Sequence, residues 1–240
     1  MLANAHAYLL EIERAGREFA ESVKFAARLG QQRPHVIALM GCDTRLDLGD
    51  ADGALTDIET ALDIIECTGI QRFEPWCLVF KARILDARGQ CGEALALAKR
   101  AVEICRDTGV TFLGPMALGS YALLCRKEDE HLAAFEEAEA LLARGCVSHD
   151  YLYFCRDAME ASLAASEWDE AERFAAALED YAREEPMPWS DYYIAWGCAL
   201  AAWGRGDGSA EDDLRRLLEQ ARKVRLGMAV PALERALADA

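Results

Sequence analysis

Basic residues and helix breakers are scarce in this chain of 240 residues. Only 26 Lys and Arg stand against 42 Asp and Glu, and the formal charge of −16 argues against a basic face for nucleic acid or an anionic membrane. Six prolines and 8% aromatic residues leave Ala- and Leu-rich stretches, which favour a soluble, largely helical protein with a sizeable core. Residues 1–6 carry no Lys or Arg, and charged residues follow from Glu11. We therefore expect neither a signal peptide nor a membrane span, and a cytoplasmic location.

The motifs of common enzymes and metal sites are also missing. The sequence has no Gly-x-x-x-x-Gly-Lys-Ser/Thr loop, which would cradle phosphates with backbone N–H groups. Its nine cysteines form no Cys-x-x-Cys pair, so we interpret them as small buried hydrophobic residues of a reduced protein. The four histidines have no Cys or Ser partner at a motif spacing. The sequence therefore predicts a noncatalytic chain with no cofactor and no metal.

One acidic cluster allows two interpretations. It consists of Asp43, Asp47, Asp50, Asp52 and Asp57. Carboxylates at this density could hold Ca²⁺, but their spacing does not follow the EF-hand loop and the terminal Glu of that loop is missing. We favour helix capping and a solvated helix face, because Asp in or before the first turn accepts hydrogen bonds from free N–H groups.

A degenerate repeat of about 40 residues is the main positive feature. Ala54 and Ala94 begin similar segments 40 residues apart, and Gly69 and Gly109 end them at the same spacing. A fixed period between 20 and 50 residues is typical of solenoids, in which each unit buries its apolar face against its neighbours. The repeat predicts an all-α protein built from helix pairs.

Apolar periodicity and the positions of Gly and Pro place these helices. We expect pairs at 2–14 with 17–29, 35–48 with 51–67, 74–88 with 91–107, 112–126 with 129–144, 149–166 with 168–184 and 189–204 with 209–224, then a capping helix at 229–239. The repeats would span 2–30, 35–69, 74–109, 112–145, 149–185 and 189–227. Every connection is short, so we expect one continuous domain over 1–240.

Small residues recur at fixed places on both helices of each pair. The register is Ala54, Ala94, His131, Ala171 and Ala210; twelve positions earlier Cys42, Ala82, Gly119, Met159 and Cys198; and seven positions later Ala61, Ala101, Ala138, Leu178 and Leu217. Short side chains are needed where two helix backbones come close together. The pattern resembles the tetratricopeptide repeat, although its period is nearer 40 than 34 residues. That resemblance implies a right-handed α-solenoid of about six antiparallel helix pairs with a C-terminal capping helix.

Four short strings carry a narrower resemblance. They are Ala3-Asn4-Ala5-His6-Ala7-Tyr8, Thr111-Phe112-Leu113-Gly114-Pro115, Gly145-Cys146-Val147-Ser148-His149-Asp150-Tyr151 and Leu178-Glu179-Asp180-Tyr181. They look like parts of the C-terminal helical region of bacterial class III adenylate or guanylate cyclase regulators. Those proteins have a cyclase domain and an NTPase domain before tetratricopeptide-like repeats, and this chain would match only the repeats. The resemblance implies a regulatory role in signalling.

In tetratricopeptide-like stacks the first helices line a concave groove, where aromatic side chains anchor a partner. The groove positions of that repeat correspond to Asp43, Asp47, Trp76, Arg83, Asp86, Met116, Ser120, Tyr153, Arg156, Glu160, Tyr192 and Trp203. The alternative is that these aromatic residues fill the core, since large rings also occupy wide gaps between helices.

Two functions remain open at this point. The first is a module that binds a polypeptide, or a neighbouring domain of its own protein, in this groove. The second is a domain that senses a small effector and thereby controls an attached cyclase or NTPase.

Overall fold

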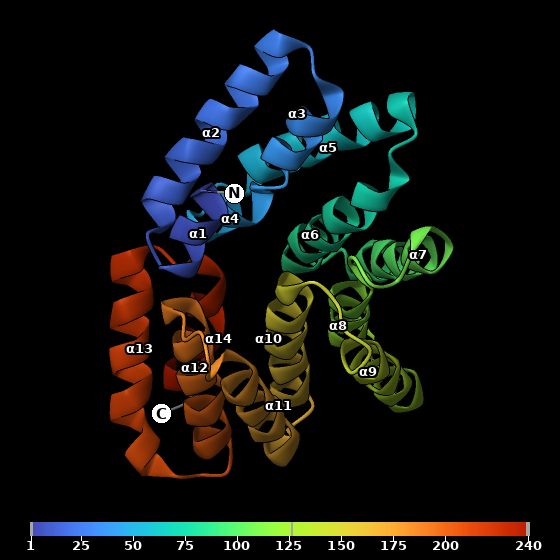
Figure 1. Ribbon diagram of the computed structural model, residues 1–240. Coiled ribbons are helices and arrows are strands. Elements are labelled where there is room, and N and C mark those ends of the chain that lie inside the picture. The colour runs from blue at the N-terminus through green and yellow to red at the C-terminus, as the bar shows by residue number, and fades with distance from the viewer. Residues whose placement is uncertain (1, 126, 239–240) are drawn as a thin grey trace.

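The computed structural model describes residues 2–125 and 127–238, and within them it contains helices and turns but no β-strand (Figure 1). The first half consists of α1 (Leu2–Tyr8), α2 (Ile12–Leu29), α3 (Gln32–Leu39), α4 (Cys42–Asp47), α5 (Ala51–Thr68), η1 (Gln71–Phe73), α6 (Glu74–Ala87), α7 (Cys91–Thr108) and α8 (Gly114–Leu124). The second half consists of α9 (Glu128–Leu142), α10 (Ser148–Ala164), α11 (Trp168–Ala182), α12 (Pro188–Gly204), η2 (Gly208–Ala210), α13 (Glu211–Val224), η3 (Gly227–Ala229) and α14 (Val230–Ala238). An all-helical fold is confirmed.

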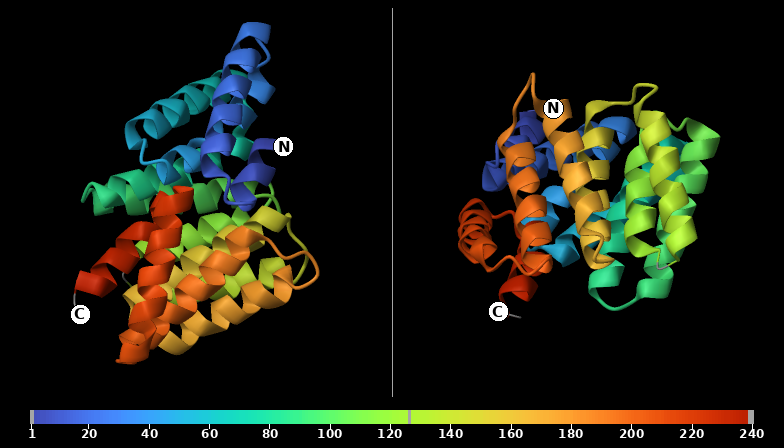
Figure 2. Two further views of the ribbon diagram at one scale, coloured as in Figure 1. Left: turned by 90° about the vertical axis from the view of Figure 1, so that its left-hand side faces the viewer. Right: turned by 90° about the horizontal axis from the view of Figure 1, so that it is seen from below.

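The helices pack in series along the chain. Each of α6 to α12 contacts the next helix in sequence, and α6, α8, α10 and α12 also contact one another in that order. In addition, α1 touches α12 and α4 touches η3, so N-terminal helices pack against C-terminal segments, although the two ends of the described chain themselves lie apart (Figure 1, Figure 2). No helix in the described part of the chain is both long and apolar enough to cross a membrane.

Burial agrees with the small-residue register of the repeat. Ala54, Ala94 and Ala171 are fully buried, and every other position of the register except Cys198 is buried too. One hydrophobic core extends from Leu10 to Leu233. Cys198 is exposed, so the expectation that it marks a close helix crossing was wrong; the outer side of α12 is open to solvent there.

The first helix pair differs from its predicted boundaries of 2–14 and 17–29. Helix α1 ends at Tyr8, and α2 runs without interruption from Ile12 to Leu29. The chain reverses at Leu10, whose φ is 58°, and the N–H of Glu11 donates to the carbonyl of His6. Gly16 is therefore not a helix end. A Cβ on Gly16 would lie 2.6 Å from Leu48, so this glycine allows α2 to approach the end of α4.

The predicted helix 35–48 is two helices. Helix α3 ends at Leu39, α4 begins at Cys42, and the chain bends at Met40 and Gly41. A Cβ on Gly41 would lie 2.3 Å from the ring of Phe19, so the backbone at the bend packs directly on that ring. Because Phe19 belongs to α2, the cause of this break is a tertiary contact and not a local breaker.

The remaining boundaries agree with the structure to within about two residues. Helix α8 is shorter than predicted, covering 114–124 in place of 112–126, and the last two segments each begin with a short 3₁₀ turn, η2 and η3. Residue 126 of the predicted fourth pair and residue 239 of the predicted cap lie outside the described residues. The pairing of antiparallel helices into a solenoid stays a prediction.

We expect Ala94→Leu to lower the free energy of unfolding by about 1 to 3 kcal/mol, because overfilling a packed core forces neighbours apart. Ala94 is fully buried between α7 and α6, in contact with a cluster containing Ala82 and Leu85. Ala96, which is exposed on the same helix, gives the matched control Ala96→Leu. Urea denaturation of both variants measures the difference. Equal midpoints for the two would contradict the packing assigned to this helix crossing.

Candidate functional site

Helix α10 carries a buried polar face at the centre of the molecule. Tyr153, Arg156, Asp157 and Glu160 are spaced at i, i+3, i+4 and i+7, which places them on one side of an α-helix. Asp157 is completely buried and Arg156 is 2% exposed, whereas Glu160 is half-buried. This face therefore brings charged groups into the interior, where each of them needs a partner.

An ion-pair group formed by Arg83, Arg156, Asp157 and Glu160 satisfies much of this need, and we call it the inner cluster. The Nη2 of Arg83 on α6 donates to Asp157 Oδ1 at 2.6 Å and to Glu160 Oε2 at 2.9 Å. The Nε of Arg156 donates to the same Asp157 oxygen at 2.9 Å. Burial alone would lower the pKa of Arg83, but the two carboxylates raise it above its ordinary value, so its guanidinium stays charged.

Asp43 connects α4 to α10 next to the inner cluster. Its Oδ2 accepts from the hydroxyl of Tyr153 at 2.5 Å, and its Oδ1 accepts from the backbone N–H of Thr44 at 2.6 Å. Burial raises the pKa of Asp43, although these hydrogen bonds and the charge of Arg156 oppose the rise. A side chain expected at a partner surface therefore joins two helices inside the protein.

Asp47 connects α4 to the C-terminal segment. Its Oδ1 accepts from the backbone N–H of Met228 in η3 at 3.0 Å, and nearby Arg225 donates to the carbonyl of Leu48 at 3.1 Å. We call these two contacts the terminal clasp. Burial raises the pKa of Asp47 to about 7; the charge of Asp43 adds to the rise, whereas the Met228 hydrogen bond and the two arginines of the inner cluster oppose it.

Aromatic rings surround Tyr153 and complete this interior. Its ring centroid lies 5.4 Å from that of Trp76, 6.0 Å from that of Phe80 and 5.9 Å from that of Trp189. The indole N–H of Trp76 donates to the carbonyl of Met40 at 2.8 Å, so its polar atom is satisfied as well. These rings are buried, which matches the interpretation of the aromatic residues as core.

A cavity of about 840 Å³ opens beside the inner cluster, between α14 and the C-terminal ends of α6 and α8, and we call it the α14 cavity. Its apolar lining comes from Leu46, Ala51, Ile84, Ala87, Leu123, Leu124, Gly227, Met228, Pro231, Ala232 and Ala238. Its charged lining comes from Arg83, Asp86, Arg88, Glu160, Glu234 and Arg235. Three basic and three acidic side chains balance there, in a chain whose net charge is −16.

The predicted groove residues fall into three groups. The buried group is Asp43, Asp47, Trp76, Met116, Ser120, Tyr153, Arg156 and Tyr192. The group lining the α14 cavity is Arg83, Asp86 and Glu160. Trp203 is half-buried near the end of α12, apart from both groups. The structure thus brings most of them together, but as an interior whose buried members do not present a surface to a partner.

Sequence reasoning missed Asp157 and the whole of α14 as parts of this region. Asp157 shares a helix face with three predicted residues, and that spacing was a usable signal. The segment η3 gave no such signal, because its Met228 contributes only a backbone N–H to Asp47, and any residue except proline supplies one.

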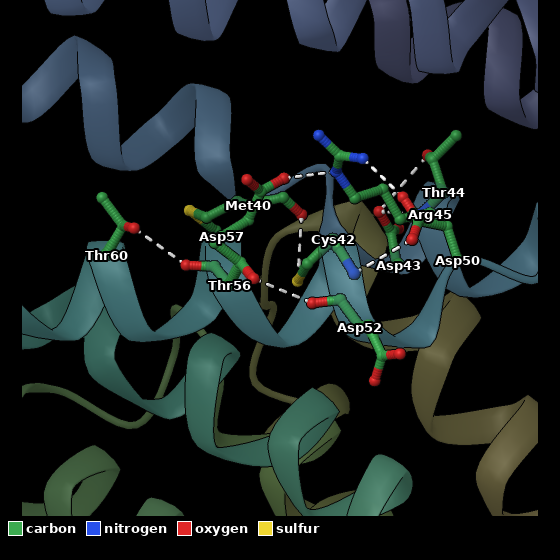
Figure 3. Close-up of polar contacts among 11 residues, drawn as sticks. Met40, Cys42, Asp43, Thr44, Arg45, Asp50, Asp52, Thr56, Asp57 and Thr60 are labelled. Atoms are coloured by element: carbon green, nitrogen blue, oxygen red, sulfur yellow. Dashed lines mark hydrogen bonds and ion pairs between the residues drawn. The ribbon is translucent and has the colours of Figure 1, made fainter.

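Three members of the predicted acidic cluster around α4 and α5 pair with arginines, and Figure 3 shows Arg45 between Asp50 and Asp57. Asp50 caps α5 by accepting from the N–H of Gly53 at 3.0 Å, so the capping interpretation is confirmed there. Arg45 pairs with Asp50 at 2.6 Å and with Asp57 at 2.5 Å, and Asp52 pairs with an arginine on α6. Asp43 and Asp47 face the interior, so they are not on a solvated face as expected.

Other reactive side chains are dispersed. All nine cysteines are free, and five of them are buried. Among residues 2–125 and 127–238, no three His, Cys, Asp or Glu side chains come close enough together to hold a metal ion. His149 and His131 each lie against a backbone carbonyl, that of Phe112 at 3.2 Å and that of Ala122 at 3.0 Å.

Comparison with known proteins gives no relative. A scan against protein-family models finds no match, and a search of curated proteins finds no matching sequence. Function must therefore be argued from the geometry of the inner cluster and the α14 cavity.

We expect Asp47→Asn to change how stability depends on pH. The pKa of Asp47 in the folded protein, about 7, lies above its ordinary value of 3.8. The folded state therefore holds its proton more tightly, so its contribution to stability is fully present below about pH 4 and is lost as the pH rises through about 7. Asn stays neutral and keeps an oxygen for Met228. Urea denaturation at about pH 5 and about pH 8 should show the variant gaining stability relative to wild type at the higher pH. A constant difference would be inconsistent with a buried titrating carboxyl.

We expect Asp157→Ala to lower the free energy of unfolding by about 3 to 5 kcal/mol, because it leaves two buried arginines without their shared carboxylate. Asp52→Ala is the matched control. It also removes a carboxylate from an arginine pair, but the Asp52 side chain is 94% exposed, and an exposed pair contributes about 0 to 1 kcal/mol. Thermal and urea unfolding compare the two variants. Similar losses for both would show that the inner cluster is not a stabilising centre.

Proposed function

We propose that the chain is a noncatalytic interaction module, built as a right-handed α-solenoid of antiparallel helix pairs, that binds a polypeptide in the α14 cavity. The observation that carries the proposal is the lining of this cavity. An apolar floor with Ile84, Leu123 and Met228 lies beside charged groups of both signs. Protein interfaces commonly have an apolar centre surrounded by polar groups.

The balance of charge in the cavity supports a polypeptide over a polyanion. Arg83, Arg88, Glu160 and Glu234 are paired within the protein, whereas Arg235 offers donors and Asp86 offers acceptors, so the site can pair with groups of both kinds. A nucleic acid would meet three carboxylates there and a strongly acidic surface elsewhere. A short amphipathic segment with mixed charges fits this chemistry best.

We propose that the module is noncatalytic because of the kinds of side chain that line the α14 cavity. The described lining of the cavity contains no Cys, His, Ser, Thr, Tyr or Lys side chain, the usual nucleophiles and bases besides carboxylates. Asp157 is shared by two arginines, and Glu160 is paired with Arg83. Carboxylates held in this way are suited to stabilising structure. A cytoplasmic location belongs to the same proposal and is supported by the free cysteines.

A second candidate is the sensing of a small effector in the same cavity. Its volume of about 840 Å³ supports this, because small-molecule sites occupy about 300 to 1,000 Å³. An effector seated against α14 would act on the terminal clasp, whose Met228 also lines the cavity. Intrinsic tryptophan fluorescence separates the two candidates. A saturable response to a metabolite favours sensing, and a response only to polypeptide favours the interaction module.

We further propose a place for the module in bacterial signalling, as a part or partner of a nucleotide cyclase regulator. Three of the four strings that resemble such regulators contact one another at one end of the structure. His149 lies against the carbonyl of Phe112, and Tyr151 stacks on Tyr181 with ring centroids 4.1 Å apart. These contacts show only that the three strings lie in one packed region of this chain. An immunoblot of the native protein tests it, since a band several times 26.5 kDa is expected if cyclase and NTPase domains are attached.

We expect a photoreactive residue at Ala87, on the rim of the α14 cavity, to cross-link to a polypeptide in cells that express the chain natively. The same residue at Ala96, which is exposed on α7 and outside the cavity lining, is the matched control and should capture far less. Mass spectrometry identifies the product. Arg235→Glu should then weaken binding of the identified polypeptide by roughly tenfold, because it reverses a charge that faces the ligand.

The comparison variant for this charge reversal is Lys223→Glu, an exposed change of the same sign on α13 away from the cavity lining. Isothermal titration calorimetry gives both affinities. Equal effects of the two variants would place the binding surface outside the α14 cavity, and equal cross-linking from Ala87 and Ala96 would do the same.

A further inference from the structure

Large exposed hydrophobic side chains gather at the N-terminal end of the molecule. Leu2, Phe25, Leu29 and Ile37 are 65%, 58%, 53% and 44% exposed, and they come from α1, α2 and α3. Elsewhere in the described chain such residues are scattered singly, as is normal on a protein surface. A group of this kind marks a surface that another protein covers.

Leu2, Phe25 and Ile37 line a groove of about 1020 Å³, which we call the N-terminal groove. Helix α2 forms one wall and α1 with α3 forms the other. The lining residues of α2 include Glu18, Glu21, Ser22, Phe25 and Arg28. Their spacing of three, four and seven residues places them on one face of the helix, so α2 presents a continuous stripe with Phe25 near its middle.

The charges on this stripe are arranged with opposite signs at its two ends. Glu21 and Arg28 are seven residues apart, two turns along α2, and Phe25 lies between them. Neither side chain pairs with another group in the part of the chain that the structure describes. Both are exposed, so their partners must come from outside the molecule or from water.

We infer that the N-terminal groove receives the α2 face of a second copy of this chain, giving a two-fold symmetric dimer. If two α2 helices lie antiparallel with the axis between positions 24 and 25, Glu21 meets Arg28 of the partner subunit, and Arg28 meets the partner's Glu21. The two Phe25 rings then pack beside the axis, while the stem of Lys24 covers their edges. A self-complementary patch is what a two-fold interface requires.

Charge complementarity selects this occupant over an unrelated apolar partner. Glu21 and Arg28 lie on either side of Phe25, at equal sequence distance from an axis between positions 24 and 25, and antiparallel pairing of identical helices satisfies both of them at once. A partner that is only apolar would leave Glu21 and Arg28 unpaired at a closed interface, which costs free energy. The inference is independent of the proposed function of the α14 cavity.

Sedimentation velocity of the intact chain from about 1 to 100 µM tests the dimer. We expect a mass near twice 26.5 kDa at the higher concentrations. Phe25→Glu should weaken association at least tenfold, whereas Leu132→Glu, a change at a similarly exposed position on α9, should leave it unchanged. Circular dichroism verifies that each variant is folded.

Charge exchange makes the test specific to the antiparallel register. Glu21→Arg and Arg28→Glu, each made alone, should weaken the dimer, and the two together should restore it, since the pairs re-form with reversed signs. A wild-type chain that stays monomeric at about 100 µM overturns the inference. So does a dimer that is insensitive to Phe25→Glu, or a double variant that is no stronger than the single ones.

Discussion

The buried carboxylate of Asp157 is the constraint on which the rest of the structure depends. Removing a charge from water costs several kcal/mol, and only well-placed partners offset that cost. Asp157 has two such partners, Arg83 from α6 and Arg156 from its own helix. Their geometry fixes the separation of α6 and α10, which in turn positions Tyr153 to reach Asp43 on α4. The aromatic packing around Tyr153 therefore lies next to the ion pairs that join α6 to α10.

The α14 cavity and the inner cluster share two residues, Arg83 and Glu160. Both residues line the cavity, and their side chains also form an ion pair with each other. A ligand that pairs with either residue therefore also acts on the contact between α6 and α10. Through Met228, the same ligand lies next to Asp47 and the terminal clasp. In the proposed function, binding in the cavity would therefore act on the contact between α4 and η3.

Helix content and most helix boundaries were predictable, because the signals are local. Ala54 and Ala94 mark close packing wherever the neighbouring helix lies, and Gly69 ends α5 in the left-handed conformation that favours glycine. The bend at Gly41 was not predictable, since it depends on a ring from another helix. The burial of the candidate site could not be predicted for the same reason: the clasp to Met228 connects residues that are far apart in the sequence.

The terminal clasp also limits the order in which contacts can form during folding. Asp47 and Met228 are 181 residues apart, so their contact cannot form until the segment that contains η3 has been synthesised. Until then, the N-terminal helices emerge with a carboxylate that has no backbone partner and with an incomplete interior. Contacts of such sequence separation slow folding, because the loop between them must close first. A helical array held only by contacts between neighbouring helices can fold by local steps, whereas the contact between α4 and η3 requires both segments to be present.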